Sequence, residues 1–330
     1  MTRAVVTGAA GFIGSHLCAH LLASGDSVLG IDSLTDYYDP ALKERNLRDL
    51  IPHPSFAFRR GDLLEAALEP LLDGADVVYH LAGQPGVRPS WGKDFELYAR
   101  RNVLASQRLL EAMRDRPLRK FVYASSSSVY GDAPVIPTGE SVCPRPLTPY
   151  GVTKLSAEHL CEVYRMSFGL PAVSLRLFSV YGPRQRPDMA LARLIEAALT
   201  GGPFPLHGNG EQVRDFTYVR DVVTAMRDAA CSSFTGVANL GGDAPVSMKH
   251  AIAAVERLVG PVNLDPRPGS RGEARHTAAD IALAARAFGY RPRTELDDGL
   301  AAMADQTVID LARRPESGST GPRAMWRGIT

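Results

Sequence analysis

The sequence has few of the features that mark secreted, metal-bound or membrane proteins. Its 330 residues include only four cysteines, Cys18, Cys143, Cys161 and Cys231, which are far apart and lack the Cys-x-x-Cys or histidine spacing of a zinc site. We therefore expect free thiols in a reducing cytoplasm, and no bound metal ion. No apolar run approaches the ~20 residues of a membrane span, and no signal peptide is evident.

An excess of charge of either sign is also missing. Lys and Arg number 37 and Asp and Glu number 36, and no long basic run supplies a local positive field. Attraction to nucleic acid or to a membrane surface is therefore not expected, and a small molecule is the expected partner. The length suits one large α/β domain, or two domains that share a cleft.

Short β-branched or apolar runs alternate with longer segments of helical periodicity. The runs that we interpret as strands are 4–7, 27–31, 56–60, 76–82, 120–125 and 172–178. The helical patterns between them are 12–24, 40–50, 97–113 and 148–168. This alternation predicts repeated βαβ units, and hence a Rossmann-type doubly wound parallel sheet covered on both faces.

The amino-acid composition changes after about Val180, where Pro and Gly cluster in loops between short helices. Such a region suits a smaller α/β domain over the open edge of the sheet, while "GVANLGG" (236–242) indicates a late strand that returns to the main sheet. We therefore expect interleaved domains. The predicted boundaries are 1–179 plus about 214–242 for the nucleotide, about 180–213 plus 243–315 for the substrate, and 316–330 for a frayed tail.

Three glycines, Gly8, Gly11 and Gly14, occupy the turn between the first strand and the first helix. Glycine suits a tight turn, a close backbone approach to a pyrophosphate, and packing of helix on strand. The N-terminus of the helix adds free N–H groups for phosphate oxygens. Asp32 ends the second strand, 18 positions after Gly14, where a carboxylate can accept the adenosine ribose hydroxyls.

Asp32 also indicates which dinucleotide binds. A 2′-phosphate would be repelled by its carboxylate, and the neighbouring Ser33 offers no guanidinium, so NAD is favoured over NADP. "GDL" (61–63) and "HLAG" (80–83) lie at the ends of the third and fourth strands, where the adenine and the nicotinamide half would lie. His80 itself is expected to be a packed residue.

Tyr150 and Lys154 stand four apart in "PYGVTK", within a helical pattern, so both project from one helix face. An ammonium near a phenol stabilises the phenolate and lowers a pKa that begins near ~10. With a positive nicotinamide beside it, such a tyrosine can act as a base near neutral pH. Alone, the pair is also compatible with an ordinary amphipathic helix.

The glycine-rich turn, the serine-rich "SSSSVYG" (125–131) and the Tyr-x-x-x-Lys pair together resemble the short-chain dehydrogenase/reductase superfamily. Over nearly the whole chain, the sequence resembles its extended branch, the NAD-dependent nucleotide-sugar epimerases and dehydratases. "TGAAGFIGSHL", "PYGVTK", "LRLFSVYGP" and "RDFTYVRDVV" match in order. The resemblance implies that the cofactor contacts Gly8, Gly11, Phe12, Ile13, Gly14, Asp32, Ser33, Asp62, Leu63, Leu81, Ala82, Gly83, Tyr150 and Lys154.

The same resemblance assigns the catalytic residues. Ser126, four residues before Tyr130, is expected to join Tyr150 at the reacting oxygen of the sugar, with Lys154 holding the phenolate. The dehydratases carry Asp-Glu at the next two positions, whereas this chain has Ser127 and Ser128. Elimination of water is therefore disfavoured, and reversible hydride transfer at C4 remains.

Several segments resemble UDP-glucuronate 4-epimerases in particular. These are "DYYDPALK" (36–43), "HLAGQPGVRPS" (80–90) with Gln84 and Arg88, and "RPDM" (186–189), preceded by Ser179 where galactose-type 4-epimerases usually carry Asn. Oxidation at C4 of a glucuronate gives a β-keto acid that loses carbon dioxide readily. Ser127, Ser128 and Arg186 are candidates to hold the carboxylate out of alignment.

The resemblance also places arginines near the UDP diphosphate. The expected substrate contacts are Gln84, Arg88, Ser126, Ser127, Ser128, Ser179, Arg186, Met189, Arg214 and Arg271. UDP-glucose 4-epimerase, UDP-glucuronate decarboxylase and a non-catalytic NAD-sensing scaffold remain alternatives to the UDP-glucuronate 4-epimerase. A homodimer built on the helices 99–113 and 148–168 is implied by the family.

Overall fold

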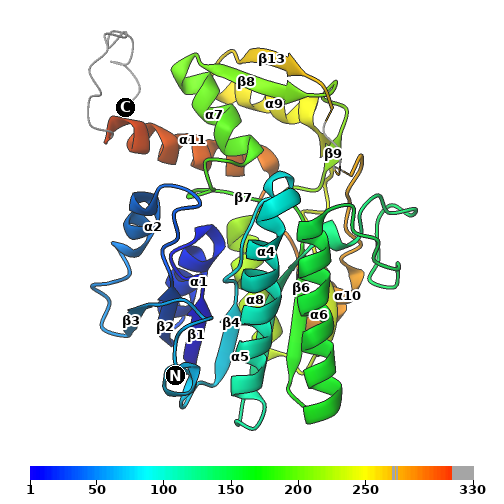
Figure 1. The fold of residues 1–330 in the computed structure, drawn as a ribbon. Helices are drawn as coiled ribbons and strands as arrows, with labels where there is room; N and C mark the ends of the chain where they lie inside the picture. The colour runs from blue at the N-terminus through cyan, green and yellow to red at the C-terminus, as the bar shows by residue number, and fades with distance from the viewer. Residues whose placement is uncertain (270–271, 273, 314–330) are drawn as a thin grey trace.

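The computed structural model describes residues 1–269, 272 and 274–313, and its centre is a seven-stranded parallel sheet (Figure 1). Its strands are β1 (Arg3–Thr7), β2 (Ser27–Asp32), β3 (Phe56–Arg60), β4 (Val77–His80), β5 (Lys120–Ser126), β6 (Ala172–Leu177) and β11 (Gly236–Leu240). The six strands predicted up to residue 178 and the late strand at "GVANLGG" are all confirmed.

The spatial order of the strands is β3-β2-β1-β4-β5-β6-β11, with every pair parallel. The chain leaves β1 toward one edge and returns beyond it at β4, so the order reverses between these two strands. In the register, Thr7 lies beside Ile31 of β2 and His80 of β4. Ligands of doubly wound sheets bind at the carboxyl ends of the strands beside such a switch point.

Helices cover both faces of the sheet because alternate strand residues are apolar on each side. Val6 of β1 packs in one core with helices α1 (Phe12–Ala23) and α8 (Val219–Cys231), whereas the neighbouring Val5 packs in the other. The helices on the face of Val5 are α3 (Leu68–Leu72), α5 (Ala105–Met113) and α6 (Pro149–Phe168), and α2 (Pro40–Leu47) lies against α1. The doubly wound fold is confirmed.

Two helices on the second face have ends and bends that the sequence explains in part. Thr148 caps α6 by accepting the N–H of Gly151, with Pro149 in the first turn, and Gly169 ends the helix at φ +70°. The predicted helix 97–113 is interrupted, since α4 (Phe95–Tyr98) and α5 flank a π-helical stretch, Ala99–Leu104. Such stretches are frequent at functional sites.

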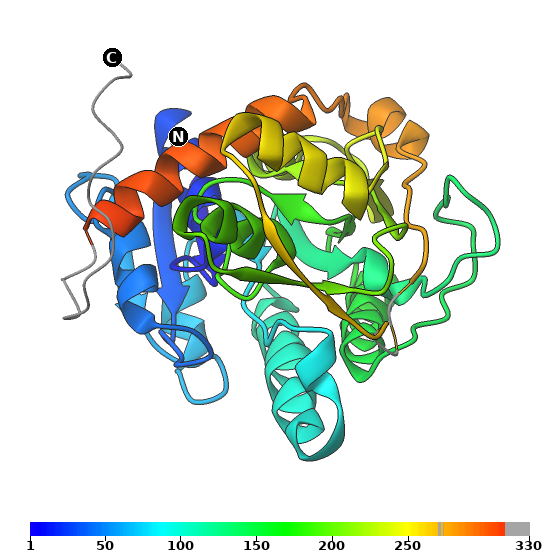
Figure 2. The ribbon, with the colours of Figure 1, turned by 90° about the horizontal axis from the view of Figure 1, so that it is seen from above.

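A smaller α/β layer covers the carboxyl ends of the strands (Figure 2). It contains helices α7 (Ala190–Thr200), α9 (Met248–Leu258) and α11 (Leu296–Ala312) around a core with Leu194, Val255 and Met303. Its strand pairs are β13 (Asn263–Arg267) with β8 (Pro203–His207) and β12 (Val246–Ser247) with β9 (Val213–Arg214). Strands β7 (Val180–Tyr181) and β10 (Thr217–Tyr218) pair near the main sheet, and α10 (Ala282–Phe288) packs on α8 and β11.

The remaining sequence expectations concern termini and membranes. The predicted tail, 316–330, lies outside the described residues. Among the residues that the structure describes, no helix combines the length and apolarity needed to cross a bilayer, and no cluster of three or more His, Cys, Asp or Glu side chains could hold a metal ion. The four cysteines are free.

Candidate functional site

Two adjoining cavities lie at the carboxyl ends of the strands, one of about 230 Å³ over the glycine-rich turn and one of about 590 Å³ beneath the smaller layer. Phe12, Ile13, Tyr150, Leu177 and Arg186 line both cavities. A group bound in one cavity would therefore contact the same wall as a group bound in the other. Such an arrangement suits a reaction between two bound molecules.

The smaller cavity depends on glycine. Gly8 adopts φ +73°, and a Cβ on it would lie 2.8 Å from the amide nitrogen of Ala82. A Cβ on Gly14 would collide with the carbonyl oxygen of Gly8, so the first turn of α1 packs this tightly only without a side chain. The turn thus leaves backbone open at the N-terminus of α1, as a pyrophosphate requires.

Asp32 lies at the end of β2 and faces this cavity. Its carboxylate accepts the N–H of Ala10 at 3.0 Å and the N–H of Leu34 at 2.8 Å, so the side chain is fixed in place. The other predicted cofactor residues also line the cavity: Gly11, Ser33, Asp62, Leu63, Leu81, Ala82, Gly83, Tyr150 and Lys154. A glycine cradle with a fixed carboxylate at the end of β2 fits a dinucleotide such as NAD.

The smaller cavity also has residues that sequence reasoning missed. Lys43 of α2 lines it, and so does Arg101 of the π-helical stretch. Arg101 donates to the side-chain oxygen of Gln84 at 2.8 Å, and Asn102 bonds both the N–H and the carbonyl of Gln84. Gln84, expected at the substrate, therefore lines the smaller cavity instead of the larger one.

Nothing in single positions indicated these residues. Lys43 ends the quoted segment "DYYDPALK" (36–43) but was given no role, Arg101 lies in a segment interpreted as helical, and the long stretch 97–113 gave no sign of its π-helical turn. Asn102, which directly follows Arg100 and Arg101, is buried and requires partners for its amide, but its burial is seen only in the structure.

Tyr150, Ser126 and Lys154 come together at the wall between the cavities. The Oγ of Ser126 accepts the N–H of Ser128 at 3.1 Å, and the hydroxyl is also hydrogen-bonded with the phenol of Tyr150. Gly151 permits this approach, because a Cβ there would lie 2.6 Å from the carbonyl oxygen of Ser128. The start of α6 is thereby held directly against the end of β5.

The electrostatics of this wall differ from the sequence-based expectation. Burial raises the pKa of Tyr150, and hydrogen bonding to Ser126 and the charge of Arg186 offset this only in part. The prediction was that Lys154 lowers this pKa, and it is wrong, because burial of the phenol raises the pKa and outweighs the effects of Ser126 and Arg186. The ammonium of Lys154 lies 4.8 Å from the ring centre of Tyr123, and burial lowers the pKa of Lys154 to about 8.

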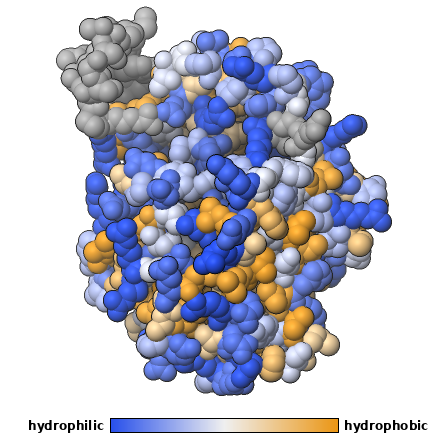
Figure 3. All heavy atoms as spheres, viewed as in Figure 1, coloured by the Kyte–Doolittle hydropathy of each residue, from blue (hydrophilic) through white to orange (hydrophobic). Residues whose placement is uncertain are grey.

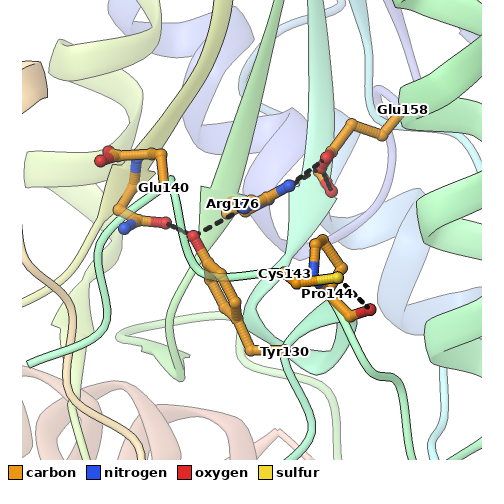
Figure 4. Close-up of polar contacts among 8 residues, drawn as sticks. Tyr130, Glu140, Cys143, Pro144, Glu158 and Arg176 are labelled. Carbon is orange, nitrogen blue, oxygen red and sulfur yellow. Dashed lines mark hydrogen bonds and ion pairs between the residues drawn. The ribbon is translucent and has the colours of Figure 1, made fainter. Parts of the chain in front are cut away.

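Behind the serine run lies a buried polar network (Figure 4). Glu158, one turn after Lys154 on α6, accepts from Ser125 Oγ at 2.8 Å and forms a two-point ion pair with Arg176 of β6. Arg176 also donates to the hydroxyl of Tyr130 at 2.7 Å, which donates to Asn239 of β11 at 2.8 Å. The hydroxyl of Ser125, the first of the four serines, is thus paired with a carboxylate behind the cavity wall.

The larger cavity collects most of the predicted substrate residues from distant parts of the chain. Its lining includes Arg88, Ser126, Ser127, Ser128, Ser179, Arg186, Met189 and Arg214. Ser179 adopts φ +24°, a conformation that Asn tolerates more readily than Ser does. Arg271 lies outside the described residues. Tyr37 and Arg193 line the same cavity and were missed: Tyr37 belongs to the quoted segment "DYYDPALK" (36–43) but was given no role, and Arg193 lies in a segment without a motif.

Arg186 is paired on the cavity wall. Its Nε and one terminal nitrogen donate to Asp188 at 2.9 and 3.0 Å, and Tyr37 donates to the same carboxylate at 3.3 Å. Tyr37 comes from the loop after β2, so this contact joins the loop to the segment before α7. A fixed guanidinium beside three serine hydroxyls can bind an anionic group.

His80 is a packed residue, as expected. It is fully buried at the end of β4, with its ring nitrogens within 2.8 Å of Thr7 Oγ1 and Ser106 Oγ. Burial lowers its pKa to about 3, with the charge of Lys154 acting in the same direction. The imidazole therefore stays neutral and links β1, β4 and α5.

Comparisons with known proteins agree with this geometry. Residues 4–239 match the NAD dependent epimerase/dehydratase family. The chain is 45% identical to "Uncharacterized UDP-glucose epimerase YtcB" of Bacillus subtilis (strain 168), over 90% of this chain and 95% of that protein. It is 35% identical to a UDP-glucuronate 4-epimerase of Thermodesulfobacterium geofontis (strain OPF15), over 90% of this chain and 93% of that protein.

A solved structure is similar over almost the whole chain. The UDP-glucuronic acid 4-epimerase from Bacillus cereus, in complex with UDP-glucuronic acid and NAD, superposes with a TM-score of 0.91 at 44% identity, covering 94% of this chain and 100% of that one. The resemblance seen in the sequence motifs is thus confirmed at the level of family and fold. The chain belongs to the NAD dependent epimerase/dehydratase family.

Proposed function

We propose that this protein is a UDP-glucuronate 4-epimerase that interconverts UDP-glucuronate and UDP-galacturonate with NAD held in the smaller cavity. The observation that carries the proposal is that the two cavities share a wall, which includes Tyr150 and Arg186. Ser126 and Tyr150 meet the larger cavity beside Ser127, Ser128 and Arg186, so hydroxyl-directed chemistry and an anion site adjoin. The similarity to epimerases whose names specify UDP-glucuronate supports the substrate.

Each residue at the wall has a proposed role. Tyr150 takes the proton of the 4-hydroxyl, and Ser126 relays or steadies that proton through its hydrogen bond with the phenol. Lys154 holds the phenolate that results. Bound NAD would supply a reversible acceptor for the hydride of C4, so no net oxidation occurs. The 4-keto sugar then turns about its diphosphate and presents its other face.

The proposed anion site protects the keto sugar. Ser127 and Ser128 donate hydroxyl hydrogen bonds to the sugar carboxylate, and Arg186 adds a charge-assisted one. These contacts keep the breaking bond out of line with the C4 carbonyl, so carbon dioxide is retained. Arg214 binds the diphosphate end, as Arg271 does by family resemblance, while Arg88 reaches the sugar side and Met189 lines the same cavity.

The test is incubation of the purified protein with UDP-glucuronate and separate quantification of UDP-galacturonate and UDP-pentose. UDP-galacturonate as the main product is expected. UDP-pentose with carbon dioxide would instead identify a decarboxylase. Tyr150→Phe is the matched control, since it should lose most turnover while NAD, measured after gel filtration, stays bound.

A UDP-glucose 4-epimerase is the second candidate. The 45% identity to a protein named as a UDP-glucose epimerase favours it, and the Ser126–Tyr150–Lys154 set serves either sugar. The two candidates differ in their need for Arg186. A higher kcat/KM on UDP-glucose than on UDP-glucuronate would replace our substrate assignment with this one.

We also propose a homodimer built on α5 and α6. Apolar surface gathers over the face on which these helices lie (Figure 3; compare Figure 1). Exposed apolar side chains on α6 and the π-helical stretch include Leu104, Val152, Val163, Met166 and Phe168. Sedimentation equilibrium tests the dimer, and Val163→Glu with Met166→Glu should convert it to a monomer.

The division of labour along the chain is proposed to follow the predicted boundaries. Residues 1–179 and about 214–242 hold NAD, and about 180–213 and 243–315 hold the UDP-sugar. We place the protein in the cytoplasm, which its free cysteines support.

A further inference from the structure

Lys43 is a cation built into the wall of the smaller cavity, near the carboxylate of Asp32. It lies on α2, 11 residues after Asp32, and is only 6% exposed. Its ammonium donates to the carbonyl oxygen of Thr35 at 2.7 Å and to the hydroxyl of Thr35 at 2.9 Å, and it lies 4.6 Å from the ring centre of Tyr38. The cation is thus fixed in position.

Thr35 accepts two of the three ammonium protons, and the third, beside the ring of Tyr38, can be donated to a ligand. Asp32 lines the same cavity, and its negative charge acts on Lys43 by raising the pKa that burial lowers. A nucleotide ribose held by Asp32 would therefore lie beside a positive charge. The sequence-based preference for NAD considered Asp32 and the lack of a guanidinium at Ser33, and it did not consider the ammonium of Lys43.

We propose that Lys43 is a latent anchor for a 2′-phosphate, which the charge of Asp32 masks in the native protein. In the native protein, Asp32 and Lys43 form a neutral environment for a ribose that carries hydroxyls only. Removal of the carboxylate leaves a fixed, desolvated ammonium, which is a favourable partner for a phosphate. The inference goes beyond the proposed function, since it concerns nucleotide binding and no step of the sugar reaction.

The experiment compares Asp32→Ser with the double variant Asp32→Ser/Lys43→Met, by calorimetry with 2′,5′-ADP and with 5′-ADP. We expect Asp32→Ser to bind 2′,5′-ADP about tenfold to a hundredfold more tightly than the double variant does, as one charge-assisted hydrogen bond supplies. The loss for 5′-ADP should be much smaller, because that nucleotide lacks the phosphate. Titration with NADPH, followed by its fluorescence, should give the same order.

Arg60 provides the matched control. It pairs with Asp32 in the register of β3 and β2, but it is exposed and lies outside both cavities. Asp32→Ser/Arg60→Met should therefore bind 2′,5′-ADP within about fivefold of Asp32→Ser. An equal affinity of the Lys43→Met double variant and Asp32→Ser would overturn the proposal, as would an equal loss for both nucleotides.

Asp32→Ser leaves the N–H groups of Ala10 and Leu34 without their acceptor, which could impair folding. Asp32→Asn is therefore included as a second variant. The amide oxygen of Asn retains one of these contacts and removes the charge. The same comparison with Lys43→Met then applies. Since these ligands report the adenosine end alone, a failure of epimerase activity would leave the result unaffected.

Discussion

Two arginine–carboxylate pairs lie near the serine run, and they differ in burial and in partners. Arg176 and Glu158 are 5% and 4% exposed and join β5, β6, α6 and β11. Arg186 and Asp188 are 19% and 39% exposed, two residues apart, and line the larger cavity. The first pair is enclosed by protein on every side, whereas the second faces a space for a ligand.

The difference explains what each pair can do. A buried pair with additional hydrogen bonds fixes geometry, since neither ion can leave its partner without being stranded in low dielectric. A pair on a cavity wall keeps unused N–H groups of the guanidinium accessible, and water compensates for small movements. We infer that the Arg176–Glu158 pair sets the distance between Ser126 and Tyr150, and that the Arg186–Asp188 pair presents a charge to a ligand.

The largest expected effect is on stability, and it comes from replacing the carboxylate of each pair by the corresponding amide. Glu158→Gln should destabilise the protein by about 3–5 kcal/mol, because Arg176 is left buried without a counter-charge. Asp188→Asn should cost less than about 1 kcal/mol, since its pair is partly hydrated. The free energy of unfolding in urea checks both values.

An apolar double variant tests the reason for that loss. Glu158→Leu with Arg176→Met removes both charges, so it should lose less stability than Glu158→Gln alone. Turnover should remain low in the double variant, because Ser125 has lost Glu158 and Tyr130 has lost Arg176. Equal stability losses in Glu158→Gln and Asp188→Asn would mean that burial does not distinguish the pairs.

Lys154 is a buried cation that, among the residues that the structure describes, forms no ion pair with a carboxylate, and its proposed purpose is catalytic. Its pKa in the folded protein is about 8, below the ordinary 10.5, so its cost to stability is full below pH 8 and disappears as the pH rises toward 10.5. Lys154→Met should therefore stabilise the nucleotide-free protein at pH 7 by about 3 kcal/mol. Urea unfolding of both proteins at pH 7 and pH 10 measures the difference, which should shrink at the higher pH.

The pair on the cavity wall should reveal itself through substrate choice. Arg186→Ala removes a charge-assisted hydrogen bond, which predicts a loss in kcat/KM on UDP-glucuronate about tenfold to a hundredfold larger than the loss on UDP-glucose. Both substrates should lose some activity, because the charge of Arg186 also lowers the pKa of Tyr150. Steady-state kinetics on the two sugars decide the matter, and equal losses would reject a carboxylate contact.

The two arginine–carboxylate pairs also show which parts of the structure can be predicted from the sequence. The parallel sheet, the glycine turn, Asp32 and the Tyr150–Lys154 face follow from local periodicity and spacing, because each depends on neighbours within a few residues. Glu158 with Arg176 and Tyr37 with Asp188 join segments 18 and 151 residues apart. Such contacts depend on how distant segments pack together. Neither a Glu on an amphipathic helix nor a Tyr in a polar loop shows in the sequence which residue it will contact. Burial, likewise, decided the pKa of Tyr150 against the prediction.

The smallest expected effect concerns Tyr37, which holds Asp188 from the nucleotide side. Tyr37→Phe removes one hydrogen bond of 3.3 Å at a partly exposed site, so Arg186 should become less ordered without losing its ion pair. We expect KM for UDP-glucuronate to rise by up to about fivefold, as a bond of about 0.5–1 kcal/mol permits, with kcat nearly unchanged. In an Asp188→Asn background the same substitution should have a smaller effect, because the two side chains act through one contact. Additive effects of the two substitutions would show that Tyr37 acts on the cavity independently of the Arg186–Asp188 pair. Arg186 would then be held in place by Asp188 without help from Tyr37.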